Sequence, residues 1–365
     1  MSELKTNKIS TNDQNNVAID NALNLKSYTT AQRDALTSVA GDMIYNSDDA
    51  KVQVYTGSAW EDLGGLSLIE IDYVVVAGGG GAAFGYTGGG GAGGLLSSVS
   101  QSGGTSNTPL PKKYFIPSTN YRISVGGGGA GSSNSSGYGS TRGTSSFLEY
   151  DTAVGGGNTF GNNAGYGHFG GSGGGDNYNG NPVENNDGIA NQGNSGGPPQ
   201  TQASSGRGGA SGGGGAGASG QQAPNQDNGG NGGVGVYCNI LTTTQATAAS
   251  VGEVSGSDVY FSGGGGGSIG VNSTGSPGSG GLGGGSDGVK GAANATNATA
   301  NTGGGGGGTG TGTGANGGSG VVIIKYPDTY TMTGGTGLTI HTPSSPPSGY
   351  TLKVFTAGTG TVSWS

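Results

Sequence analysis

The chain has 365 residues, of which 90 are glycine and 12 are proline, and its formal net charge is −8. Glycine makes up about 7% of an average protein, so this composition is typical of either a disordered low-complexity chain or a repetitive ordered one. Apolar stretches alternate with the glycine runs, which favours order, and the lack of a sustained Gly-X-Y repeat excludes collagen. The acidic charge argues against a nucleic-acid partner.

Targeting and redox signals are sparse. Cys238 is the only cysteine, so we expect no internal disulfide and no cysteine-based metal cluster. The opening residues are polar and lack the apolar core of a secretory signal. No apolar run approaches the ~20 residues that a membrane-spanning helix needs. We therefore expect a soluble protein that is made in the cytoplasm and leaves the cell by assembly or lysis.

Residues 1–64 contain few glycines and predict a small α/β module. The stretch 29–36 predicts a short helix, with a capping box formed by Thr29 and Gln32 and a stop at Gly41. Two strands around a polar turn are predicted after it, at 43–46 and 52–55. Because so small a unit cannot bury a full core, we expect it to associate with other copies.

Residues 65–327 form a glycine-rich body, in which apolar strands lead directly into glycine runs. Four strands are predicted just before such runs, at 73–77, 121–125, 152–154 and 259–262. The stretches 72–77 and 320–326 are both rich in valine and isoleucine, which favour strands. We expect these two stretches to be neighbours in one sheet, with everything between them as an insertion.

The glycine runs predict polyproline-II-type helices, with about three residues per turn and a rise of about 3.1 Å. Such a helix makes no internal hydrogen bonds, so neighbouring helices must bond to one another to satisfy their backbones. Ordering one residue costs roughly 1–2 kcal/mol, with glycine at the high end. Sparse apolar side chains cannot offset this cost, so we expect dense bonding between helices and a multimer.

Residues 328–365 change in composition again and predict a small β unit that docks onto the body's sheet. Alternating strands are expected at 338–341, 352–355 and 361–364. The sequence as a whole predicts a mainly β fold: an antiparallel β-sandwich or jelly-roll-like framework, an inserted polyglycine-II helix bundle, and a small α/β N-terminal module. The predicted domains are 1–64, 65–327 and 328–365.

Recognisable catalytic and cofactor motifs are missing. Matches to GxGxxG arise by chance in so glycine-rich a chain, and no GxxxxGK[ST] motif is present. His168 and His341 are the only histidines and have no metal-ligand spacing, and no nucleophile elbow lies in a strand-turn-helix context. Acidic residues of the body are scattered, as shown by Glu149, Asp151, Asp176, Glu184 and Asp187. We therefore expect a protein that is not an enzyme and that holds no cofactor or metal.

Two other local patterns have structural interpretations. Cys238 lies in the apolar stretch 236–240 and is predicted to be a buried strand residue. Four asparagines begin glycosylation sequons, which we interpret as a consequence of composition: Asn134, Asn272, Asn294 and Asn297.

The longest polar loop, 158–207, mixes aromatic residues with asparagine, serine and glycine, as binding loops do. Its candidate binding residues are Phe160, Tyr166, His168, Phe169 and Tyr178. In the alternative interpretation, these side chains cap the glycine helices against water. As a group with Tyr86 and Tyr138, they predict a surface for a glycan or a membrane protein.

The strand-and-glycine stretches resemble a known family, the glycine-rich domain found in bacteriophage tail and virion structural proteins. The resemblance rests on YVVVAGGGG at 73–81, YRISVGGGGAG at 121–131, YFSGGGGG at 260–267 and GSGVVIIKY at 318–326. The opening LKTNKI and residues 28–63 resemble the N-terminal module of phage tail-fibre-like proteins. The closing GYTLKVFTAGTGTVSW is similar to a strand pair that often precedes YVVVAGGGG in this family, but here it ends the chain.

This resemblance implies a virion protein, expected to be a homotrimer with its N-terminal part toward the particle. Glycine-rich distal adhesins of T-even-type phages bundle polyglycine-II helices and touch the host receptor with loops at one end. By analogy we expect a tail-fibre or adhesin subunit on an exterior appendage of the virion. The implied partners are other tail or capsid proteins and a host-surface glycan or outer-membrane protein.

Three alternatives remain open at this point. The first is a capsid fibre, decoration or tail-connector protein with no receptor. The second is an ice-binding protein, for which the run at 309–313 supplies alternating threonines. The third is a depolymerase, which would need carboxylates clustered in a cleft.

Overall fold

The computed structural model describes residues 25–63, 68–104, 108–133, 140–161, 167–178, 186–200 and 207–365. The chain divides into two compact units, Met1–Ser67 and Leu68–Ser365, and each is described by itself. The division into three domains by role stays a prediction.

The first unit is a four-stranded sheet, in the order β1-β2-β3-β4, with one short helix. Its elements are β1 (Ser27–Tyr28), α1 (Thr30–Asp34), β2 (Met43–Asn46), β3 (Lys51–Tyr55) and β4 (Trp60–Asp62). Both predicted strands are confirmed as β2 and β3. The capping box is also confirmed, because Thr29 and Gln32 each accept the other's backbone N–H through their side chains. The helix ends at Asp34, well before the predicted stop at Gly41, because Ala35 already serves as its C-cap.

The interior of this first unit is polar. Asn46 and Gln53 are buried, whereas Ile44 is the only hydrophobic side chain in the core among residues 25–63. Asn46 Nδ2 donates to Gln53 Oε1 (3.1 Å), and Gln53 Nε2 donates to Asp62 Oδ1 (2.8 Å). Such a network specifies one arrangement of the strands but supplies little hydrophobic stabilisation.

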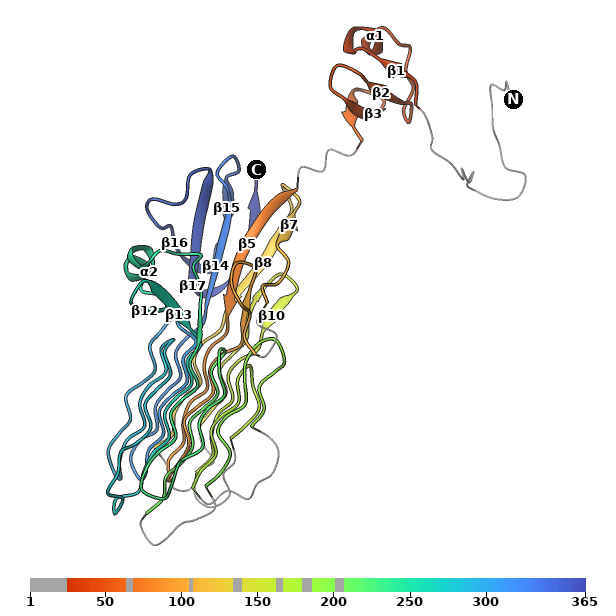
Figure 1. Ribbon diagram of the computed structural model, residues 1–365. Helices are drawn as coiled ribbons and strands as arrows, with labels where there is room; N and C mark the ends of the chain where they lie inside the picture. The colour runs from red at the N-terminus through yellow and green to blue at the C-terminus, as the bar shows by residue number, and fades with distance from the viewer. Residues whose placement is uncertain are drawn as a thin grey trace, which may run out of the picture. The chain divides into compact units, whose positions relative to one another are not determined.

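The second unit is built on one antiparallel sheet that closes almost into a barrel. Its main strands follow the order β10-β9-β8-β17-β14-β5-β6 (Figure 1). In addition, β7 pairs with β5, and β15 and β16 pair with β17. The strands are β5 (Ile69–Val76), β6 (Leu95–Ser97), β7 (Lys113–Phe115), β8 (Tyr121–Val125), β9 (Ser146–Leu148), β10 (Asp151–Ala153), β14 (Val321–Pro327), β15 (Met332–Gly334), β16 (Leu338–His341) and β17 (Tyr350–Trp364). The mainly β prediction is confirmed, and this nearly closed sheet takes the place of the predicted sandwich or jelly-roll framework.

The two ends of the glycine-rich body meet in this sheet, as predicted. β5 pairs antiparallel with β14, with Val74 opposite Ile323. Residues 328–365 contribute strands to the same sheet. Among them β17, which has 15 residues, pairs with β14, β16, β8 and β15 along its length. The strands predicted at 352–355 and 361–364 are two parts of β17.

A residue of the glycine-rich body bridges the edge strands β6 and β10. Gln192 O accepts the Leu95 N–H (3.0 Å), and Gln192 Oε1 accepts the Val154 N–H (2.8 Å). Gln192 Nε2 also donates to Thr152 O (3.0 Å). Because Leu95 begins β6 and Val154 follows β10, Gln192 links the two sides of the gap in the barrel-like sheet.

The central strands β5 and β14 are buried on both faces. Successive side chains of a strand point to opposite sides, so each strand contributes to two hydrophobic clusters. Tyr73 and Val75 belong to the cluster that also contains Phe355 and Trp364. Val74 and Val76 belong to a second cluster, which packs against an additional layer.

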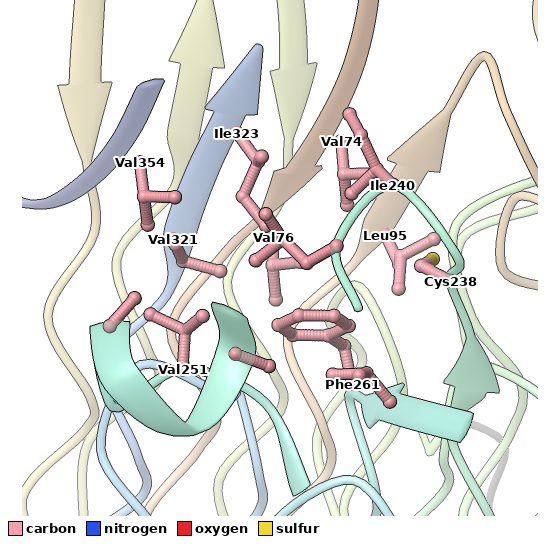
Figure 2. Close-up of a cluster of buried hydrophobic side chains, with 14 of the residues drawn as sticks. Val74, Val76, Leu95, Cys238, Ile240, Val251, Phe261, Val321, Ile323 and Val354 are labelled. Atoms are coloured by element: carbon pink, nitrogen blue, oxygen red, sulfur yellow. The ribbon is translucent and has the colours of Figure 1, made fainter. Parts of the chain in front are cut away.

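That layer consists of β11 (Val236–Tyr237), α2 (Thr243–Ala249), β12 (Glu253–Ser255) and β13 (Asp258–Phe261), with strand order β11-β13-β12. Figure 2 shows Phe261 close to Val76, and Val251 close to Val321. Cys238 lies in this cluster, and its predicted burial is confirmed. Its predicted place in a strand is wrong, because β11 ends at Tyr237.

Glycine-rich segments run side by side from the end of the sheet, and their hydrogen bonds repeat every three residues (Figure 1). The N–H groups of residues 78, 79 and 80 donate to the carbonyls of Thr144, Gly318 and Gly91. Gly81 and Ala82 then return to the first two segments, donating to Thr141 and Ala315. The carbonyls of residues 78, 79 and 80 accept from three further segments, through the N–H groups of Gly156, Gly129 and Gly306. This segment is therefore bonded to six neighbours, whereas a strand has two.

Close backbone approach excludes side chains from the middle of this array. A Cβ added to Gly265 would lie 2.1 Å from Gly306 O, and one on Gly80 would lie 2.1 Å from Gly157 O. Gly127, at the flank, is different, because the nearest atom to its added Cβ would be Thr144 Oγ1 at 3.8 Å.

Candidate functional site

Three of the predicted binding residues gather around an arginine on the flank of the glycine segments. Phe160, His168 and Phe169 lie with Arg142, and we call these four residues the Arg142 cluster. Tyr166 and Tyr138 lie outside the described residues.

Backbone bonds between neighbouring segments fix the Arg142 cluster. The residues on either side of Arg142 donate their N–H groups to Ala130 O and Gly156 O. His168 N donates to Asn158 O (2.9 Å), which holds the segment of His168 and Phe169 beside the segment of Phe160. The side chains therefore come from three segments that are joined by backbone hydrogen bonds.

The side chains of the cluster form a continuous stack. The Arg142 guanidinium carbon lies 3.8 Å from the centroid of Phe169, within the range of a cation–π contact. Arg142 Nη2 lies 3.4 Å from His168 Nδ1, and the rings of Phe160 and His168 meet edge to face at 4.5 Å. Phe169 remains 49% exposed, so one ring of the stack faces solvent.

The electrostatics of the cluster keep its histidine uncharged near neutral pH. Burial lowers the pKa of His168, and the Arg142 charge lowers it further. A neutral Nδ1 can accept a hydrogen bond from the Arg142 guanidinium. The cluster therefore offers an exposed aromatic face beside a single cation, which suits binding through stacking and donated hydrogen bonds rather than acid–base chemistry.

Tyr178 is placed elsewhere, with Tyr86. The two rings meet edge to face at 5.3 Å, and an added Cβ on Gly208 would lie 2.6 Å from the Tyr178 ring. This packing matches the alternative interpretation, in which aromatic residues cover glycine backbone.

Sequence reasoning missed Arg142, which lies outside the loop 158–207. A signal was present, because Arg142 is one of three arginines within residues 65–327. A cation in so uncharged a segment needs a partner, and aromatic faces supply one.

The asparagine sequons have a structural role that the sequence analysis did not identify. Asn294 Oδ1 accepts the Thr313 N–H (2.8 Å), and Asn297 Oδ1 accepts the Asn316 N–H (3.0 Å). The three-residue spacing of these asparagines equals the period of the backbone bonds. Their side chains therefore replace a neighbouring carbonyl at the edge of the array.

The described residues contain no group of three or more His, Cys, Asp or Glu side chains that could hold a metal ion. The two described helices, α1 and α2, are too short and too polar to cross a bilayer.

The geometry defines a class of protein: a nearly closed antiparallel sheet from which hydrogen-bonded glycine segments extend. A family model described as a glycine-rich domain matches residues 57–327, so the chain belongs to this glycine-rich domain family. Comparisons with curated proteins and with solved structures gave no match.

Proposed function

We propose that the protein is a tail-fibre or adhesin subunit of a bacteriophage, located on an exterior appendage of the virion. Its N-terminal module attaches to the particle, and the glycine-rich domain binds the host surface without catalysing a reaction. The resemblance of residues 28–63 and of the glycine-rich stretches to phage proteins supports this role. The observation that carries the binding part is the half-exposed Phe169 stacked on Arg142.

We infer that the glycine segments are polyglycine-II helices packed in a bundle, inserted into the β framework. The three-residue period of hydrogen bonding supports this, because such a helix has about three residues per turn and no internal bonds. A bundle of this kind holds binding residues at fixed positions, which lowers the entropic cost of binding.

The proposal includes a homotrimer that also contacts other tail or capsid proteins. The polar interior of the N-terminal module supports self-association, because Ile44 is the only buried hydrophobic residue among residues 25–63 and so small a core stabilises the module little. Three copies would present three Arg142 clusters together, so weak single contacts to a host glycan or outer-membrane protein would gain avidity.

An antibody against residues 65–327, located by gold labelling on intact particles, tests the proposal. We expect label at the distal ends of fibres and inhibition of adsorption. Label on the capsid or the tail base, without inhibition, would instead identify a capsid fibre, decoration or connector protein.

A matched pair of variants tests the Arg142 cluster itself. Phe169→Ala is expected to weaken binding of the full-length protein to host cells roughly tenfold, as for an interface hot spot. Tyr237→Ala, which removes a half-exposed ring from the outer layer, should leave binding unchanged. Equal binding by both variants and the wild type would exclude the cluster from recognition.

A further inference from the structure

A pocket lies on the outer face of the barrel-like sheet, apart from the Arg142 cluster. Its volume is about 410 Å³, within the ~300–1,000 Å³ range of ligand pockets. It is lined by Arg122 of β8, Phe147 of β9, Thr152 of β10, and the hairpin residues Glu149 and Tyr150.

Strand pairing directs these side chains outward. Phe147 lies opposite Thr152 and also opposite Ser124 of β8. Their sequence neighbours Ile123 and Leu148 are buried in the cluster of Trp364. Because side chains alternate along a strand, the residues between them face solvent.

The hairpin that completes the pocket is held firmly. Glu149 N donates to Arg122 O (2.8 Å), and Glu149 Oε2 accepts the Arg122 N–H (2.7 Å). On the other side, Lys113 Nζ lies 2.9 Å from Asp151 Oδ2.

The turn itself is strained in a way that exposes an aromatic ring. Glu149 has φ +54°, a left-handed conformation that favours glycine, yet this glycine-rich chain places glutamate there. The next residue, Tyr150, is 89% exposed. A fixed turn that holds a large ring in water, beside a pocket, is typical of a binding site rather than of a packing contact.

The chemistry of the pocket selects among ligands. The Arg122 guanidinium carbon lies 4.7 Å from the Phe147 centroid, so this cation already makes a cation–π contact. Its N–H groups are the hydrogen-bond donors of the pocket. Glu149 adds a carboxylate acceptor and Thr152 a hydroxyl. The Glu149 carboxylate would repel an anionic ligand. An apolar ligand would remove water from the charges of Glu149 and Arg122 without replacing its hydrogen bonds.

A neutral sugar matches these groups, because its hydroxyls both donate and accept while its C–H face suits the negative face of an aromatic ring. Hydroxyls continue across the neighbouring strands, where Ser124 and Thr359 lie 2.7 Å apart and Thr333 and Ser363 lie 3.0 Å apart. We propose that the pocket of Arg122, Phe147, Glu149, Tyr150 and Thr152 binds a neutral sugar unit of a polysaccharide. The site shares no residue with the Arg142 cluster, so either can fail without the other.

Saturation-transfer NMR on the full chain tests the inference, with the methyl glycosides of glucose, galactose, mannose and N-acetylglucosamine as probes. We expect transfer to the C–H protons of at least one sugar. Tyr150→Ala should raise the dissociation constant roughly tenfold, because one aromatic contact with the sugar is lost. Tyr114→Ala, which removes a ring that is 57% exposed on β7, is the matched control and should bind as the wild type does.

Three results would overturn the inference. They are no transfer to any of the four sugars, equal binding by Tyr150→Ala and the wild type, and tighter binding of glucuronate than of the neutral glycosides. Because Tyr150 is almost fully exposed, unchanged thermal unfolding of Tyr150→Ala would show that any lost binding is not lost folding.

Discussion

The barrel-like sheet and the glycine segments that continue from it satisfy their backbones in different ways. In the sheet, β14 bonds to β5 on one side and β17 on the other, which leaves both faces free for side chains. In the glycine segments, the N–H groups donate to three neighbours in turn, and most of the glycines leave no space for a Cβ. The sheet is therefore stabilised by two hydrophobic clusters, and the segments mainly by hydrogen bonds.

This difference makes the segments dependent on the sheet. A hydrogen bond contributes only about 0.5–1.5 kcal/mol net, which is no more than the roughly 1–2 kcal/mol that ordering a residue costs. The strands β5, β8 and β10 of the sheet lead into glycine segments, as does β13 of the additional layer, so these strands fix where the segments begin. We expect the two regions to unfold together.

The largest effect is expected in the hydrophobic cluster of the sheet. Trp364 is fully buried and meets the rings of Phe115 and Tyr326 at 5.3 and 5.6 Å. Trp364→Ala should lower the free energy of unfolding by about 3–5 kcal/mol, through lost transfer energy and a cavity. Denaturant titration should give one transition for sheet and segments, with Tyr114→Ala as the control. Separate transitions would contradict the dependence of the segments on the sheet.

A smaller but sharper effect is expected from one methyl group in the glycine segments. Gly265→Ala would place a Cβ 2.1 Å from Gly306 O, and the resulting backbone shift should lower the free energy of unfolding by about 3 kcal/mol. Gly127→Ala, whose Cβ would meet only Thr144 Oγ1 at 3.8 Å, should change it by less than about 0.5 kcal/mol. Similar losses in both variants would mean that conformational freedom, and not close approach, explains the glycines.

Strand positions could be predicted from the sequence because their signals are local. Stretches rich in valine and isoleucine predicted β5 and β14, and the similar composition of the two stretches predicted that they pair, as the structure confirms. The near closure of the sheet could not be predicted, because its two edges are joined by Gln192, one polar residue in a long loop, and by the bond from the Gly94 N–H to Val154 O. The helix α2 was missed although Thr242 and Gln245 form the same capping box as in α1, because the surrounding glycines outweighed this signal.

The candidate site could be predicted only in part, for a similar reason. Composition pointed to Phe160, His168 and Phe169, which share one loop. Their arginine comes from another segment, and only the lateral bonds of the array bring it beside them. The pocket around Tyr150 has the same origin, because three strands and a turn contribute one residue or two each.

Buried charge differs between the two regions as well, and this gives the smallest expected effect. In the sheet, the Asp72 carboxylate is paired with Lys325 Nζ at 2.8 Å. In the glycine segments, Asp176 instead accepts from neutral amides, the Gly167 N–H (2.7 Å) and Asn186 Nδ2 (3.3 Å). Burial raises the pKa of Asp176 from 3.8 to about 6.

The sign of the pH dependence follows from where the proton is held. Between pH 3.8 and about 6 the folded chain keeps the Asp176 proton while the unfolded chain releases it, so stability falls as the pH rises through this window. Asp176→Asn should reduce the loss of unfolding free energy across this window by roughly 2 kcal/mol. The variant should then be more stable than the wild type at pH 7. Denaturant titrations at pH 4 and pH 7 measure the difference, with the exposed Asp328→Asn as control. If Asp176→Asn and the wild type lose stability equally across this window, the glycine segments tolerate a buried carboxylate without cost, and the contrast with the paired charges of the sheet does not hold.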